Sequence, residues 1–315
     1  MTEPELTRLV ECVPNLSEGR RPEVVDEIVA AFAGAGPEVL VLDRSSDPDH
    51  NRTVITLMGP GPALVEAAVA GARACARLID LTSHRGAHPR MGALDVLPFV
   101  PFGAVTRLRG GDAPDLDCTD LALRAGRGIA EEAGVPVYLY GAAARHPGWS
   151  ALPAVRGRGF EALRAGGHAP DFGGPGLHPT AGATAVGARE VLIAFNVVLA
   201  GADLDLARRI AAAVRERDGG LPAVRAMGVP VEAGVQVSMN LLDWRVTSPA
   251  EAYAAVAALA GRHGARVEAS EVVGLAPAGA FEGVDPADLR LHASLDDLLL
   301  ESRLLQALTT SKENR

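Results

Sequence analysis

The sequence has 315 residues, 48% of them hydrophobic, and its 39 acidic side chains outnumber its 30 basic ones to give a formal charge of −9. This length and hydrophobic content predict two modest α/β domains rather than one core. The acidic balance argues against nucleic acid or an anionic membrane as a partner, and an anionic small substrate would be bound by local arginines, since Lys312 is the only lysine.

Apolar spacing predicts helices and strands along most of the chain. The first series is a strand over 9–13, a helix over 22–35, strands over 38–43 and 53–59, a helix over 62–79, a strand over 94–100, a helix over 121–133 and a strand over 135–140. The second series is a strand over 190–199, a helix over 204–217, strands over 223–229 and 235–242, a helix over 250–263 and a strand over 266–274.

Each series contains the order βαββαβ, which is the split βαβ or ferredoxin-like motif. We therefore predict an α+β fold of two ferredoxin-like subdomains, with residues 1–180 in the first and residues 181–305 in the second. A polar tail at 306–315 follows, and its end is expected to be poorly ordered.

The segment at 169–189, which joins the two series, is dense in glycine and proline. Neither helix nor strand is expected to persist there. The segment is either an interdomain linker or a binding loop. Its few charges and many small residues would allow a flat ligand to approach the backbone closely, as functional loops between rigid elements often do.

The three cysteines, Cys12, Cys75 and Cys118, show no metal-ligand spacing. Neither a disulfide framework nor a structural zinc site is therefore expected, and a reducing cytoplasm is the simplest compartment. The N-terminus lacks the pattern of a signal peptide. No uncharged apolar run reaches the roughly 18 residues that would predict a membrane span.

A glycine-interrupted loop before the strand at 94–100 concentrates polar side chains, with the sequence HRGAHPRMGALD. Histidine titrates near neutral pH, so His84 and His88 are candidate acid/base groups, although a lone histidine is more often structural. Metal binding by this pair is disfavoured, because Gly86 and Pro89 interrupt the helix that would place both imidazoles on one face.

A series of motifs resembles the glutamate formimidoyltransferase family and covers nearly the whole chain. In order, they are VECVPNLSEGR at 10–20, DHNRTV at 49–54, HPRMGALDVLPFVP at 88–101, GVPVYLYG at 134–141, HPTAGATAVGAR at 178–189, AFNVVL at 194–199, QVSMNLLD at 236–243 and EVVGLAP at 271–277. They occur in the order of the family.

The resemblance implies an enzyme of histidine catabolism that moves a formimino group from N-formiminoglutamate to N5 of tetrahydrofolate. Tetrahydrofolate is then a co-substrate, and no metal is required. The resemblance also implies two ferredoxin-like subdomains with the folate site between them, and a homodimer. Animal members are fused to a cyclodeaminase, for which this chain leaves no room, so a separate cyclodeaminase is expected to carry out the next step.

The resemblance also assigns residues. The catalytic histidine of the HPRMGA motif corresponds to His88. The folate-binding segment corresponds to Gly173, Gly174, Pro175, Gly176, Leu177, His178, Pro179, Thr180, Ala181 and Gly182. Asn51 and Arg52 match the NRT motif and Arg90 follows the catalytic histidine, and these three residues are candidates to bind substrate, since a guanidinium can hold a carboxylate bidentately.

The chain departs from the family pattern at two positions where members carry acidic residues, because Ala87 and Ala142 stand there instead. A carboxylate beside His88 would raise the pKa of its imidazole. Two alternatives therefore stay open: a related one-carbon transferase that uses another formimino or formyl donor, and a folate-binding protein that has lost catalysis.

Overall fold

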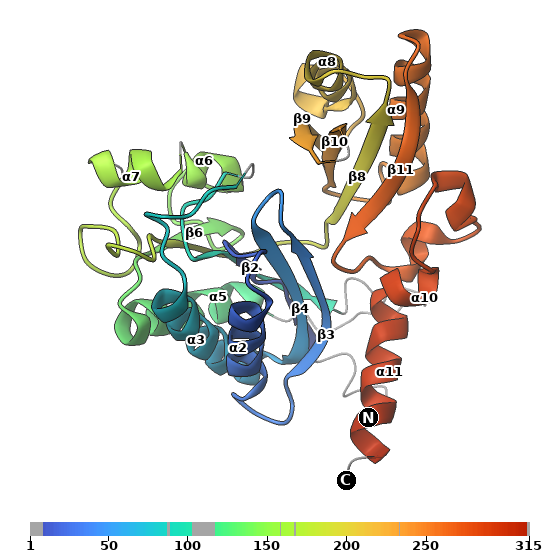
Figure 1. The fold of residues 1–315 in the computed structure, drawn as a ribbon. Coiled ribbons are helices and arrows are strands. Elements are labelled where there is room, and N and C mark those ends of the chain that lie inside the picture. Colours follow the sequence, from blue (N-terminus) through green and yellow to red (C-terminus); the bar gives the residue numbers. More distant parts are fainter. Residues whose placement is uncertain are drawn as a thin grey trace. The chain divides into compact units, whose positions relative to one another are not determined.

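The computed structural model describes residues 9–86, 89–102, 117–157, 159–166, 168–232 and 234–313, and the chain forms two compact units, Met1–Arg189 and Glu190–Arg315. Figure 1 shows each unit as a sheet with its own helices. The division between the units lies after Arg189 rather than after residue 180, because the strand β7 (Thr184–Ala188) belongs to the sheet of the first unit.

The first unit is built on a βαββαβ core with further elements added. Its elements are β1 (Leu9–Cys12), β2 (Asn15–Leu16), α2 (Pro22–Ala33), β3 (Leu40–Asp47), β4 (Arg52–Pro60), α3 (Gly61–Leu78), β5 (Leu94–Pro101), α5 (Cys118–Gly128), a π-helical turn over Ile129–Ala133, β6 (Val137–Gly141), α6 (Leu152–Arg156), α7 (Phe160–Gly166) and β7. Strands β1 and β2 both lie between β4 and β5 and act as one interrupted strand. The resulting order, β3-β4-β1/β2-β5, is that of a ferredoxin-like sheet.

Strand β7 corrects the prediction that the whole connecting segment is irregular. Its residues are all buried, and it runs parallel to β5 on one side and to β6 on the other. A central position in a sheet satisfies every backbone group and offsets the weak strand propensity of TAVGA. The glycine-rich loop therefore ends before Thr184.

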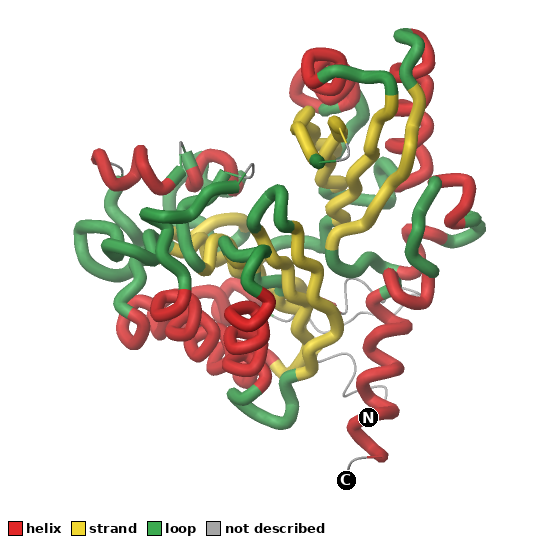
Figure 2. Tube along the Cα trace, in the orientation of Figure 1, coloured by secondary structure: helices red, strands yellow, loops and turns green. Residues whose placement is uncertain are grey.

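Side chains of the first sheet alternate between two clusters. Helices α2, α3 and α5 cover one face, where Phe32, Leu97 and Val186 are fully buried, and Figure 2 shows these helices gathered on one side of the strands. The short helices α6 and α7 contribute Val155 and Leu163 to a smaller cluster on the other face. The segment around α7 is therefore fixed against strands β6 and β7.

The second unit confirms the predicted ferredoxin-like order. It contains β8 (Ile193–Ala200), α8 (Leu204–Val214), β9 (Val224–Val231), β10 (Gly234–Leu241), α9 (Pro249–Arg262) and β11 (Arg266–Val273). The antiparallel sheet has the order β11-β8-β10-β9. Helix α9 starts at a capping box in which Ser248 and Glu251 bond to each other's backbone N–H groups.

The C-terminal region ends in helices, and the predicted tail at 306–315 is helical as far as Glu313. Short 3-10 helices span Ala278–Phe281 and Pro286–Leu289, and α10 (Leu295–Leu298) and α11 (Leu300–Glu313) follow. Buried Leu300 and Leu304 anchor α11, which continues through the strong helix formers of its next turn, residues 305–308. Among the described residues, no helix is long and apolar enough to cross a membrane.

Candidate active site

The loop that joins α3 to β5, residues 79–93, is named the HPRMG loop after its sequence at 88–92. Two of its residues, Ala87 and His88, lie outside the described residues. On its N-terminal side, a Cβ atom on Gly86 would lie 2.3 Å from the carbonyl oxygen of His50. Only glycine allows this close approach. The loop that carries the predicted catalytic histidine is thereby packed directly on the DHNRT segment.

Asn51, a predicted substrate residue, instead joins three backbone segments. Its Oδ1 accepts from the N–H of Gly19 at 2.9 Å, and its Nδ2 donates to the carbonyl oxygen of Arg85 at 2.9 Å. Its backbone has a φ of 48°, which asparagine tolerates better than most residues. The side chain is therefore engaged within the protein and fixes the start of the HPRMG loop.

Arg52, the second candidate, lies in a buried ion-pair cluster. Its Nη1 and the Nη2 of Arg156 both lie 2.9 Å from Oδ2 of Asp95, which is completely buried. Burial lowers the pKa of Arg52 to about 10, although Asp95 opposes this shift, so the guanidinium stays protonated at neutral pH. The other carboxylate oxygen of Asp95 accepts from the N–H of Met91 at 2.7 Å. The cluster thus anchors the HPRMG loop through the backbone of Met91.

Arg90, the third candidate, connects the loop to α7. Its Nη2 lies 2.8 Å from Oε1 of Glu161 and 3.3 Å from the carbonyl oxygen of Leu81. The hydrogen bond from Arg90 lowers the pKa of Glu161 below its usual range. All three predicted substrate residues are therefore held by protein groups. Arg156, which pairs with Asp95 beside Arg52, was missed because it stands in no motif.

The predicted folate-binding segment, 173–182, lies against the HPRMG loop. The N–H of Leu81 donates to the carbonyl oxygen of Thr180 at 2.8 Å, and the N–H of Ala93 donates to that of Ala181 at 2.9 Å. Within the segment, Nδ1 of His178 accepts from the N–H of Ala181 at 3.0 Å. Two motifs that are far apart in the sequence are thus joined at one place in the first unit.

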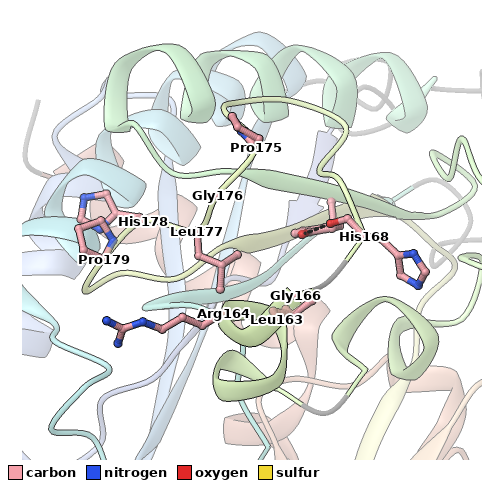
Figure 3. A pocket seen from close by; sticks show the side chains of 10 residues that line it. Leu163, Arg164, Gly166, His168, Pro175, Gly176, Leu177, His178 and Pro179 are labelled. Atoms are coloured by element: carbon pink, nitrogen blue, oxygen red, sulfur yellow. Dashed lines mark hydrogen bonds between the residues drawn. The ribbon is translucent and has the colours of Figure 1, made fainter.

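A pocket of about 200 Å³ opens beside this segment. Figure 3 shows its walls, with Leu177 extending toward Leu163. One wall is Pro175, Gly176, Leu177, His178 and Pro179, from the predicted folate-binding segment; the other is Tyr138, Leu163, Arg164, Gly166 and His168. Sequence reasoning missed the second wall, because α7 and the residues after it carry no motif. The predicted segment thus contributes one wall of a concave surface.

The glycines of the segment fall into two groups. Gly182 has a φ of +71°, and a Cβ atom there would lie 2.2 Å from the carbonyl oxygen of Met91. Beside Gly174 and Gly176, a Cβ atom would meet nothing within 4 Å. Gly182 is thus required by the fold, whereas Gly176 leaves space at the pocket wall.

Substituting the two kinds of glycine is therefore expected to give different results. Gly176→Val adds bulk to the pocket wall and should weaken binding of a reduced folate by about tenfold. Its free energy of unfolding should equal that of the parent protein. Gly182→Val should destabilise the protein by about 2 kcal/mol or more. Equilibrium titration and urea denaturation of both variants test this, and unchanged affinity in Gly176→Val would place folate elsewhere.

His84 is a structural histidine in this loop. It is buried, and its Nε2 lies 3.0 Å from the carbonyl oxygen of Asn51, so Nε2 carries the proton. Burial lowers the pKa of His84 below 6.5, although this hydrogen bond opposes the shift. Between the lowered pKa of the folded state and about pH 6.5, the unfolded chain binds a proton that the folded protein does not, so acid destabilises the fold.

We expect His84→Gln to reduce the pH dependence of stability. The free energy of unfolding of the parent protein should fall as pH drops below about 6.5, with His84 contributing at most about 1.4 kcal/mol per pH unit. In His84→Gln that contribution should be absent. Urea denaturation between pH 5 and 8 measures it, with His263→Gln as a surface control; identical slopes in His84→Gln and the parent would contradict the assignment.

No group of three metal-binding side chains occurs among the residues that the structure describes. Cys12, Cys75 and Cys118 are all buried, and burial raises the pKa of Cys12 and of Cys75. These thiols are suited to packing rather than to nucleophilic attack.

Comparison with known families identifies the class of protein to which this two-unit α+β chain belongs. The model of the formiminotransferase domain, N-terminal subdomain, matches residues 9–189, and that of the formiminotransferase domain matches residues 194–288. The chain belongs to the formiminotransferase family.

Three relatives show how much of the chain this similarity covers. The chain is 41% identical to glutamate formimidoyltransferase of Thermoplasma acidophilum, over 95% of this chain and 98% of that protein. It is 40% identical to the Streptococcus pyogenes enzyme of the same name, over 95% of this chain and 100% of that protein. Formimidoyltransferase-cyclodeaminase of Sus scrofa is 43% identical over 86% of this chain but only 51% of its own length.

Proposed function

We infer that this protein is a glutamate formimidoyltransferase, which transfers the formimino group of N-formiminoglutamate to N5 of tetrahydrofolate. The observation that carries this inference is the similarity over the full length of relatives with that name. The junction of the HPRMG loop with the predicted folate-binding segment supports it, because a transferase must bring its two substrates together at the reacting atoms.

His88 is proposed as the general acid/base. N5 attacks the amidine carbon of the donor, and the proton that N5 loses passes to the imidazole. The tetrahedral intermediate then collapses with cleavage of the bond between carbon and the glutamate nitrogen, and the imidazole returns the proton to that nitrogen. Glutamate leaves as the amine and the formimino group stays on N5, so no covalent enzyme intermediate is required.

Contacts on both sides of His88 hold the backbone of the HPRMG loop in place. Gly86 packs on His50, Asp95 holds the N–H of Met91, and Arg90 ties the loop to Glu161. These contacts fix both flanks of His88. A fixed loop maintains the short distances on which proton transfer depends.

Residues 173–182 are proposed to bind tetrahydrofolate as co-substrate, without a metal. The pocket walls of Pro175 and Leu177 present apolar surface, and the open space beside Gly174 and Gly176 exposes backbone groups to a ligand. We further propose a cytoplasmic enzyme of histidine catabolism, active as a homodimer and followed by a separate cyclodeaminase.

The identity of the donor is the open variable, because Ala87 and Ala142 replace acidic residues of the family pattern. A related formimino or formyl donor is the second candidate. The test is transfer to tetrahydrofolate with N-formiminoglutamate, formiminoglycine or 5-formyltetrahydrofolate offered separately. Turnover with N-formiminoglutamate supports the proposal; turnover only with another donor changes the substrate, and binding without any turnover indicates a folate-binding protein.

A further inference from the structure

We propose that Arg164, on α7, pairs with a glutamate carboxylate of a substrate bound in the pocket described above. This inference rests on the proposed function. Both proposed substrates end in glutamate, so the shared chemistry is a flexible group that carries carboxylates. The residue lies outside every family motif and in the wall of the pocket opposite the predicted folate-binding segment.

Arg164 differs from the other arginines of this region in its partners. Arg52 and Arg156 are paired with Asp95, and Arg90 is paired with Glu161. Within the described part of the chain, no carboxylate pairs with Arg164. Its guanidinium carbon lies 5.9 Å from the centroid of the Phe160 ring, in a cation–π arrangement. Its side chain is exposed, so its donors are accessible to a ligand.

The position of Arg164 in the pocket suits a ligand with an apolar body and a charged end. Leu163 and Leu177 line the pocket, and Figure 3 shows the Arg164 side chain extending away from Leu163, to the side of the view where His178 and Pro179 lie. A planar guanidinium at the edge of an apolar surface favours bidentate pairing with a carboxylate.

The size of the pocket indicates that it holds part of a substrate. Its volume of about 200 Å³ lies below the roughly 300–1,000 Å³ of sites that enclose a whole drug-sized ligand. The aminobenzoyl ring of a folate would match the leucine and proline walls, with its glutamate reaching Arg164. The smaller N-formiminoglutamate is the other source of a carboxylate.

The experiment compares ligands with and without glutamate. Trp149 lies 5.7 Å from the rings of Tyr138 and His168, both of which line the pocket, so its fluorescence is a direct readout of binding. Parent protein, Arg164→Gln, Arg164→Lys and the surface control Arg124→Gln are titrated with 5-formyltetrahydrofolate, with the matching pteroate that lacks glutamate, and with N-formiminoglutamate.

Arg164→Gln is expected to weaken binding of 5-formyltetrahydrofolate by about tenfold and to leave binding of the pteroate unchanged. Arg164→Lys should restore part of the loss, and Arg124→Gln should match the parent. If the loss falls on N-formiminoglutamate instead, the donor supplies the carboxylate. Parent-like binding of both glutamate ligands by Arg164→Gln overturns this inference alone, whereas a parent protein that binds none of the three ligands overturns the proposed function as well.

Discussion

Replacing His88 with asparagine is expected to lower kcat by about 10²–10⁴-fold while leaving the affinity for a reduced folate nearly unchanged. Asparagine keeps a hydrogen-bonding side chain of similar reach, but it cannot accept and return a proton near neutral pH. The measurement is steady-state transfer to tetrahydrofolate, with equilibrium folate titration of the same variant. The two readouts separate loss of proton transfer from loss of binding.

His84 provides the matched control, since it is another histidine of the same loop. Its Nε2 bonds to the carbonyl oxygen of Asn51, so its replacement should reduce stability rather than the chemical step. His84→Gln is therefore expected to retain kcat within a small factor when assayed well below its unfolding transition. Turnover of His88→Asn at the parent rate would show that another group moves the proton.

Replacing Asp95 with alanine is expected to reduce the free energy of unfolding by about 3–5 kcal/mol, because it leaves two guanidinium groups in a buried site without their shared carboxylate. Arg52 and Arg156 are each only 13% exposed, so water would not readily replace Asp95. The N–H of Met91 also loses its acceptor. Turnover should fall together with stability, since the HPRMG loop loses its anchor. Urea denaturation monitored by circular dichroism measures the first effect.

A second substitution tests whether charge is the cause. Adding Arg156→Met to Asp95→Ala removes one of the two remaining positive charges, so the double variant is expected to be more stable than Asp95→Ala alone. Asp120→Ala removes an exposed partner of Arg124 and should cost less than about 1 kcal/mol. An Asp95→Ala protein as stable as the parent would mean that the cluster contributes nothing to the fold.

The periodicity of apolar residues predicted the helices and strands that bury one face. It did not predict elements whose structure depends on pairing with strands distant in the sequence. The second unit follows its predicted order because β8, β10 and α9 each bury one face. Strand β7 was missed, since its small residues gain their order from pairing with β5 and β6, which no local pattern reports. Its omission also placed the domain boundary too early.

The candidate site was also predicted only in part from the sequence. Family motifs indicated the HPRMG loop and the predicted folate-binding segment, and the structure brings these two segments together. The motifs did not reveal that Asn51, Arg52 and Arg90 are held by protein groups, because ion pairing depends on residues such as Glu161 that are distant in sequence. The contribution of α7 to the pocket was likewise visible only once β6 and β7 were placed.

The insertion of β7 between β5 and β6 has a consequence for biosynthesis. When β6 leaves the ribosome it has no neighbour to pair with, because the strand that joins it to β5 comes only at Thr184–Ala188. Parallel pairing over such a sequence separation is slow to form and leaves apolar edges exposed in the meantime. The sheet of the first unit therefore stays incomplete until β7 has been synthesised. Strand β7 follows residues 173–182 in the chain and completes the sheet. The pocket beside residues 173–182 would then form at the same late stage of folding as the complete sheet.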